Sequence, residues 1–208
     1  MKRCLWLVPF LLSSTMCYAQ IADKGVDYFD KVIEANPQNA EAYRRRGLAY
    51  EKEHDTSQAM LDYDKAIQLN PNVALLYWNR GLLFYKNGNC DQAIADFSKY
   101  LQFKPKSELT LLMRGQAYYQ NENYDLAISD FNNYLNIDRQ WKWSPYFAYI
   151  DLAFTYLKSR NNDKAWEYAR KAQAEELISH PNTSDSVVGL GSYREVIEEL
   201  ENFSVREK

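Results

Sequence analysis

The sequence predicts an all-α protein in which pairs of helices repeat along the chain to form a solenoid that ends in a capping helix. Two observations predict this fold. Proline, glycine and alanine recur at intervals of 34 residues, and the apolar residues between them have helical spacing. The 208 residues also contain only 7 Gly and 6 Pro, and 46% are apolar. This composition excludes a disordered or loop-dominated chain and supplies enough apolar residues for a core.

The 34-residue repeat has four columns in register. Its members are Gly47, Gly81 and Gly115, then Ala59, Ala93 and Ala127, then the aromatic residues Tyr63, Phe97 and Phe131, and Pro37, Pro71 and Pro105. Within one unit, Tyr43, Gly47 and Tyr50 share one helical stripe, and Ala59, Tyr63, Ala66 and Ile67 share another. Each unit is therefore predicted to be two helices. The residues expected to cap the second helices are Asp55, Asn89, Asn123 and Asn161.

The first unit, Tyr43-Gly47-Tyr50-Ala59-Tyr63-Pro71, resembles the tetratricopeptide repeat pattern. Two further units match it, namely Tyr77-Gly81-Phe84-Ala93-Phe97-Pro105 and Leu111-Gly115-Tyr118-Ala127-Phe131. A degenerate fourth unit, Tyr149-Ala153-Tyr156-Ala165-Ala172, is displaced by four residues because the segment Trp141-Lys142-Trp143-Ser144 lengthens the junction before it. The resemblance covers about residues 22–177 and implies a right-handed helix-turn-helix solenoid.

The chain is predicted to contain four segments. These are a signal peptide at 1–19, a half-repeat helix at 20–38, a solenoid at 39–177 with units of about 40–73, 74–107, 108–141 and 146–177, and a loop with a capping helix at 178–208. Lys2 and Arg3 before the apolar run from Leu5 to Leu12, with Ala19 as the cleavage point, are typical of a signal peptide. We therefore expect an exported protein, periplasmic or secreted. Lipidation at Cys17 is not expected, because Met16 is too large for that processing.

Charged residues recur with the same register. Arg46, Arg80 and Arg114 each precede a repeat Gly, and Asp62, Asp96 and Asp130 follow them by 16 residues. In the fourth unit both partners are lost together, with Leu152 and Tyr168 in their places. We predict that an Arg–Asp pair joins the two helices of each intact unit, because losing both partners is tolerated better than losing one.

The resemblance implies that the first helices line a concave groove that holds a partner. The groove is predicted to be apolar and aromatic, with basic and amide groups that orient the partner at one end. Its residues would be Arg44, Arg45, Leu75, Trp78, Asn79, Leu82, Tyr85, Leu112, Gln116, Tyr119, Ile150 and Phe154. Three occupants of this surface remain open: a peptide or helix of another protein, the C-terminal helix of the same chain, or a second copy in a homodimer.

The predicted function is that of an adaptor or scaffold that binds another exported or envelope protein. The alternative is a regulator or inhibitor of an envelope enzyme or toxin. The 25 basic and 28 acidic residues do not favour nucleic acid as a partner, and no apolar run after the signal peptide is long enough to span a membrane. No metal ligand cluster, cofactor motif or catalytic group is recognisable. A third hypothesis, catalysis by Cys90, is disfavoured because that residue lies at a repeated helix turn.

Overall fold

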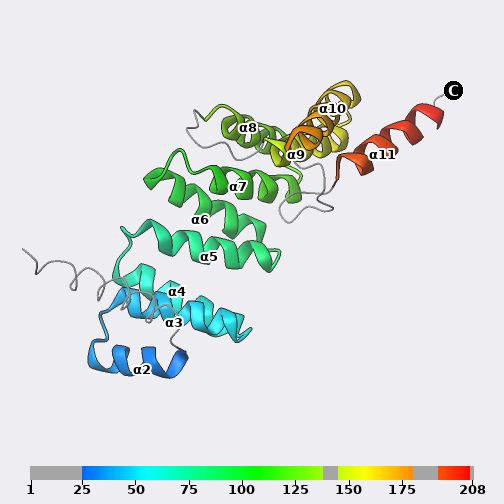
Figure 1. Cartoon of the computed structure of the whole chain (residues 1–208). Coiled ribbons are helices and arrows are strands. Elements are labelled where there is room, and N and C mark those ends of the chain that lie inside the picture. The colour runs from blue at the N-terminus through cyan, green and yellow to red at the C-terminus, as the bar shows by residue number, and fades with distance from the viewer. Residues whose placement is uncertain (1–24, 138–144, 180–191, 207–208) are drawn as a thin grey trace, which may run out of the picture. The chain divides into compact units, whose positions relative to one another are not determined.

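The computed structural model describes residues 25–137, 145–179 and 192–206, and in these ranges it contains ten helices and no strand (Figure 1). The helices are α2 (Val26–Ala35), α3 (Ala40–Lys52), α4 (Thr56–Leu69), α5 (Ala74–Lys86), α6 (Cys90–Phe103), α7 (Glu108–Gln120), α8 (Tyr124–Leu135), α9 (Tyr146–Lys158), α10 (Asn162–Ser179) and α11 (Tyr193–Arg206). The predicted all-α repeat fold is confirmed. The predicted signal peptide and the insertion at 141–144 lie outside the described residues.

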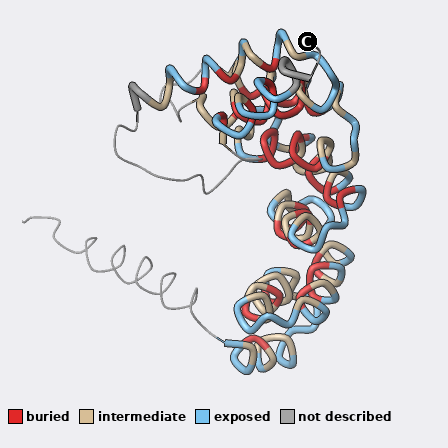
Figure 2. Tube along the Cα trace, turned by 90° about the vertical axis from the view of Figure 1, so that its right-hand side faces the viewer, coloured by how far each residue is buried: buried red, intermediate tan, exposed pale blue. Residues whose placement is uncertain are grey.

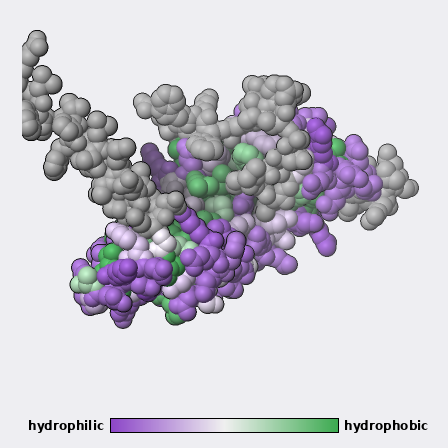
Figure 3. All heavy atoms as spheres, turned by 60° about the horizontal axis from the view of Figure 1, so that its bottom comes forward, coloured by the Kyte–Doolittle hydropathy of each residue, from purple (hydrophilic) through white to green (hydrophobic). Residues whose placement is uncertain are grey.

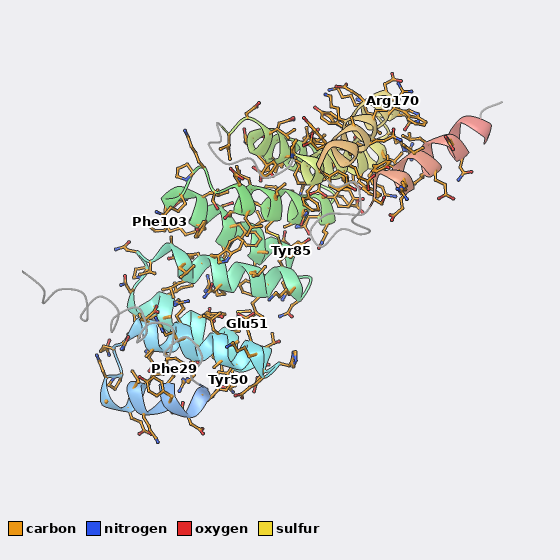
Figure 4. The ribbon with its side chains drawn as sticks, in the orientation of Figure 1. Phe29, Tyr50, Glu51, Tyr85, Phe103 and Arg170 are labelled. Carbon is orange, nitrogen blue, oxygen red and sulfur yellow. The ribbon has the colours of Figure 1, made fainter. Side chains whose placement is uncertain are left out.

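The chain divides into two compact parts after Leu83, and each is described by itself. In the first part, α2 packs against α3, and α3 packs against α4. Phe29 is buried and points from α2 toward α3 (Figure 4). Ala59 and Tyr63 of α4 are also fully buried, in a cluster that includes Leu83 of α5. Ala59 and Tyr63 lie on one of the helical stripes that the sequence predicts.

In the second part, the helices from α6 to α11 pack in chain order, and α9 also contacts α7 and α11. Buried residues lie on the sides of these helices that face their neighbours (Figure 2). The last helix contacts α10 and α9, as α9 contacts α8 and α7. It therefore takes the position that the first helix of a further unit would have. Its buried stripe of Tyr193, Val196 and Leu200 belongs to the hydrophobic cluster of the second part.

Two of the repeated glycines are required by close packing between the helices of a unit. A Cβ atom at Gly47 would lie 2.7 Å from Cε1 of Tyr63, and one at Gly115 would lie 2.5 Å from Cε1 of Phe131. Both distances are far shorter than van der Waals contact, so only glycine fits beneath these rings. The repeated Gly and the repeated aromatic residue are thus explained by one close contact between the two helices of a unit.

The predicted Arg–Asp pairs form in the first and third units. Arg46 donates two hydrogen bonds to Asp62, at 2.8 and 2.7 Å, and Arg114 donates two to Asp130, both at 2.7 Å. The Asp62 hydrogen bond is the main reason that the pKa of Arg46 is raised. For the second unit, the pairing of Arg80 with Asp96 stays a prediction.

Each of the three arginines also contacts a residue 16 positions before it, on the preceding second helix. Arg46 Nη1 donates to Asp30 at 2.7 Å, Arg80 Nη1 donates to Asp64 at 2.6 Å, and Arg114 Nη1 donates to the hydroxyl of Ser98 at 2.9 Å. The partners Asp30, Asp64 and Ser98 are themselves 34 residues apart. The guanidinium of Arg46 or Arg114 therefore joins the second helix of its own unit to that of the unit before.

The fourth unit replaces the ion pair with aromatic packing. Leu152 is fully buried, and the ring of Tyr168 stacks on that of Tyr156 with centroids 5.5 Å apart and an angle of 15°. The ammonium of Lys171 lies 4.5 Å from the centroid of Tyr168. The joint loss of Arg and Asp predicted from the sequence is thus accompanied by a stack that needs no buried charge.

The turns inside the units share one backbone feature, a residue with positive φ. These residues are His54 (62°), Gly88 (76°), Glu122 (60°) and Arg160 (62°). Only one of the four is glycine, so three turns place an ordinary side chain in the left-handed region.

The residues expected to cap the second helices all lie at the helix starts, but two of them do not cap as predicted. Asp55 accepts from the N–H of Gln58, and Asn161 accepts from that of Lys164. By contrast, the side chains of Asn89 and Asn123 make no capping hydrogen bond. The predicted side-chain cap is therefore wrong for these two residues. Their backbone carbonyls still accept from the N–H groups of Ala93 and Ala127 at the helix start.

Candidate functional site

The basic end of the predicted groove is formed by one carboxylate held between two guanidinium groups. Arg44 donates two hydrogen bonds to Glu41, both at 2.7 Å, and Arg45 donates a third at 2.6 Å. Burial acts to raise the pKa of Glu41, but the hydrogen bonds from Arg44 and then Arg45 outweigh it, so the pKa is lowered. The predicted positive end is therefore half neutralised, by a residue that the sequence analysis did not single out.

A neighbouring polar contact lies on the same first helix. The hydroxyl of Tyr63 donates a short hydrogen bond to Glu51. Burial, followed by this hydrogen bond, raises the pKa of Tyr63. Glu51 therefore links the two helices of the first unit through its hydrogen bond from Tyr63.

The segment of α5 in the first part carries the most open apolar surface of the predicted groove. Leu75 is 42% exposed, and Trp78 and Leu82 are half-buried. Asn79 lies among them and is only 8% exposed. Its Nδ2 is the one buried side-chain nitrogen or oxygen in the described ranges that has no hydrogen-bond partner. Leaving such a donor unpaired costs about 1–3 kcal/mol, so a movement of this amide that brings it to an acceptor is favoured.

In the second part, four predicted groove residues belong to the core. Leu112 is 5% exposed, Gln116 3%, Ile150 0% and Phe154 8%. This corrects the expectation that they present a surface to a partner. Leu112, Ile150 and Phe154 lie in the same hydrophobic cluster as the buried residues of α11, which packs against α9.

Tyr85 and Tyr119 remain half-buried, and Tyr85 comes from the last turn of α5 (Figure 4). Exposed apolar side chains elsewhere in the described ranges are scattered over several helices, among them Leu61, Leu109 and Leu126. In Figure 3, hydrophobic residues lie among broader hydrophilic areas on the face shown. Single exposed leucines of this kind are normal on a protein surface and define no site.

The second part contains a chain of hydrogen bonds that joins five side chains. The thiol of Cys90 donates to Oε1 of Gln120 at 3.0 Å, and Nε2 of Gln120 donates to the hydroxyl of Tyr85 at 3.0 Å. Tyr85 donates to Oε1 of Gln116 at 3.3 Å, and Nε2 of Gln116 donates to Oδ2 of Asp151 at 2.8 Å. The prediction placed Tyr85 and Gln116 in the groove but gave no sign that Asp151 and Gln120 complete the chain. Four of the five lie on first helices, and Cys90 begins the second helix α6; this placement is the one signal that the sequence offered.

Two observations bear on metal and thiol chemistry in the described residues. These residues contain no group of three or more His, Cys, Asp or Glu that could hold a metal ion. Burial, with a smaller effect from Asp91, raises the pKa of Cys90, which disfavours the reactive thiolate. Among the helices in the described ranges, none is long and apolar enough to cross a membrane.

Fold and site together define an all-α helix-pair repeat protein with an open apolar surface on a first helix. Family models described as tetratricopeptide repeat match residues 40–73 and 79–140. The chain belongs to the tetratricopeptide repeat family. Members of this family are typically scaffolds for protein–protein interaction, and no catalytic family is indicated.

Solved structures show the same fold. A crystal structure of MamA is 21% identical, with a TM-score of 0.67 over 76% of this chain and 90% of that one. A fragment of MamA from Desulfovibrio magneticus RS-1 is 17% identical, with a TM-score of 0.67 over 74% and 85%. YrrB, described as a TPR protein with an unusual peptide-binding site, is 18% identical, with a TM-score of 0.70 over 81% and 84%. No curated protein sequence matches the chain.

Proposed function

We propose that this chain is a scaffold that binds a peptide or helix of another protein along the first-helix surface of α5. The observation that carries the proposal is the buried Nδ2 of Asn79, which has no partner in the described ranges. It lies among the apolar side chains of Leu75, Trp78 and Leu82, of which Leu75 is openly exposed. A partner that covers these side chains and offers a carbonyl oxygen to the Asn79 amide, once that amide turns outward, would satisfy it and bury apolar area together.

Two further observations support this function. The fold is similar to that of YrrB, whose description includes a peptide-binding site, although an identity of 18% carries only the fold. The positive charge of the basic end is half neutralised, because Arg44 and Arg45 share Glu41. We therefore expect apolar contacts and the amide to dominate affinity, with the charged end setting orientation.

The proposal is tested by affinity capture with three forms of the protein: the natural chain, Asn79→Ala and Asn133→Ala. Asn133 is an exposed residue of α8 and serves as the matched control. A partner held by the natural chain and by Asn133→Ala, but lost or weakened at least about tenfold by Asn79→Ala, supports the α5 surface. Equal retention by all three forms would contradict it.

The captured protein then separates the scaffold from its alternative. A synthetic segment of the partner that binds with the affinity of the whole partner supports recognition of a peptide or helix. Binding that requires the folded enzyme or toxin domain, and that blocks its active site, would instead support a regulator or inhibitor. Concentration-dependent sedimentation of the chain alone would show whether a second copy competes for the same surface.

We further propose that the protein is exported and acts in the periplasm or outside the cell. The supporting pattern is Lys2 and Arg3 before the apolar run, followed by Ala19. Amino-terminal sequencing of the protein from its native host should give Gln20 as the first residue. A chain that keeps Lys2 and Arg3, or one lipidated at Cys17, would contradict this proposal.

A further inference from the structure

The hydrogen-bond chain of the second part begins at a carboxylate. Asp151 is fully buried, and Gln116, which donates to it, is 3% exposed. Oδ2 of Asp151 accepts this hydrogen bond, whereas an amide has one end that donates and one that accepts. Gln116 must therefore turn Nε2 toward Asp151, which leaves its Oε1 facing Tyr85.

The orientation of the Gln116 amide determines which group donates in each of the next hydrogen bonds. Because Oε1 of Gln116 can only accept, the hydroxyl of Tyr85 donates its single hydrogen to it. Tyr85 can then only accept from Gln120, which must present Nε2 to it and Oε1 to Cys90. The thiol of Cys90 is left as the donor at the far end. Every bond in the chain thus points the same way, toward Asp151.

We infer that Asp151 is a positioning residue, which fixes the direction of this chain and thereby holds Gln120 in the orientation that donates toward Tyr85. The side chain of Gln120 is the exposed member of the chain. Its Nε2 carries two hydrogens, and one of them is used by Tyr85. The other is available to a hydrogen-bond acceptor, such as a peptide carbonyl oxygen.

Burial explains how one residue can control a group several bonds away. Water cannot replace the partners of Asp151 and Gln116, so reversing the chain would leave two acceptors facing each other in the core. The pKa of Tyr85 agrees with this arrangement. Burial and then the charge of Asp151 raise it to about 12, while the hydrogen bond from Gln120 lowers it slightly.

For a partner that contacts the second part, the inference rests on the proposed function, namely that this chain binds other proteins, and adds one requirement of its own. A group that meets Nε2 of Gln120 should be an acceptor, because this nitrogen has one hydrogen left after its bond to Tyr85. The surface around α7 would thus select peptide carbonyl or side-chain carbonyl groups.

The direction of the chain is measured at Cys90, by the infrared S–H stretching band of the full chain with Cys4→Ser and Cys17→Ser. A thiol that donates a hydrogen bond absorbs at lower frequency than one that does not. We expect a single low-frequency band in this parent protein. In Asp151→Asn, we expect a higher-frequency S–H band to appear beside the low-frequency band or to replace it. An amide at 151 can donate or accept, so the chain of hydrogen bonds can reverse. Nε2 of Gln120 can then face the sulfur of Cys90, whose thiol no longer donates.

The charge swap Asp151→Asn with Gln116→Glu should restore the low-frequency band. Glutamate at 116 can accept both from the new amide and from Tyr85, so the original direction is compatible again. Asp130→Asn is the matched control, because Asp130 is a buried carboxylate of the same part that pairs with Arg114 and stands outside the chain. It should leave the band unchanged.

An unmoved band in folded Asp151→Asn would overturn the inference, and so would a band that the charge swap fails to restore. If Asp151→Asn does not fold, Gln116→Leu gives the same test, since it cuts the chain between Asp151 and Tyr85. The band is measured without any partner. Failure of the capture experiment together with the expected band shifts would therefore reject the proposed function and leave the role of Asp151 standing.

Discussion

Gly115 lies directly beneath the ring of Phe131, so close that a single added carbon would come within 2.5 Å of Cε1. The fourth unit has alanine at both corresponding positions, Ala153 and Ala169, and both are fully buried. The larger residue on one helix is thus accompanied by the smaller residue on the other. The side-chain volumes at the two positions are therefore complementary. We expect the effect of a substitution at one position to depend on the residue at the other.

Gly115→Ala should destabilise the protein by about 1–3 kcal/mol, because the ring of Phe131 has to move in a packed core. Adding Phe131→Ala should make the double variant less unstable than the sum of the two single effects, since space is then available for the new methyl group. Urea unfolding of the four proteins measures this coupling. Gly25→Ala, where a Cβ meets nothing within 4 Å, is the control and should change little. Strict additivity would contradict the steric explanation.

Ser98→Asp should stabilise the second part by about 0.5 kcal/mol, as expected for a partly exposed ion pair. Ser98 accepts from Arg114 in the same way that Asp30 accepts from Arg46. A carboxylate at 98 would give Arg114 the charged partner that Arg46 already has. The gain should disappear in about 1 M salt, whereas Ser98→Asn should give no gain at either salt concentration.

Arg114→Leu should destabilise the protein by about 3 kcal/mol, because it leaves Asp130, which is 2% exposed, as a buried charge without its guanidinium partner. Combining it with Asp130→Tyr should recover much of the loss, because Leu152 and Tyr168 occupy these positions in the fourth unit. Thermal unfolding of the single and double variants provides the measurement. A double variant as unstable as the sum of its parts would show that the two residues act separately.

Replacing a left-handed turn residue with glycine should raise stability. Glu122 has a φ of 60°, which costs an ordinary side chain about 1 kcal/mol. Glu122→Gly should therefore stabilise by up to about 1 kcal/mol, and Gly88→Ala, at a φ of 76°, should destabilise by a similar amount. Opposite signs in urea unfolding are the expected result. Changes of the same sign in the two unfolding free energies would contradict this explanation from backbone strain.

Alkaline pH should weaken the fold through tyrosine. The pKa of Tyr85 is raised to about 12 by burial and by Asp151, from an ordinary value of 10.0. The contribution is fully present below pH 10 and is lost as pH rises toward 12, because the unfolded chain releases the proton first. Since Tyr85 is only half-buried, its share is about 1 kcal/mol after solvent screening. Tyr85→Phe should flatten the fall in unfolding free energy over this range.

The sequence was sufficient to predict the helix pairs, because each repeated column reflects a contact inside one unit. Gly115 with Phe131 and Arg114 with Asp130 lie 16 residues apart, so a single period reveals both. Burial of Ile150 and Phe154 could not be predicted in the same way. It depends on the packing around α9, and no repeat relates the last helix to the earlier units.

Partners between polar residues were also incompletely predicted. Glu41 was overlooked although it stands three and four residues before Arg44 and Arg45, a spacing that favours ion pairs on a helix. The role of Asp151 had no sequence signal of its own, because a carboxylate in an apolar helix gives no indication of which amide donates to it.

Contacts within a unit and contacts between units differ in how they would survive the copying of a 34-residue segment. Gly115 and Phe131 belong to one unit, so a duplicated segment carries their fit intact to any place in the array. The contact between Arg114 and Ser98 joins two units and has to be made anew with each neighbour. Contacts within a unit should therefore stay uniform, while contacts between units should vary in residue type. The partners of the three arginines on the preceding unit, Asp30, Asp64 and Ser98, already vary in this way. Each junction can then differ in strength from the next although the units themselves look alike.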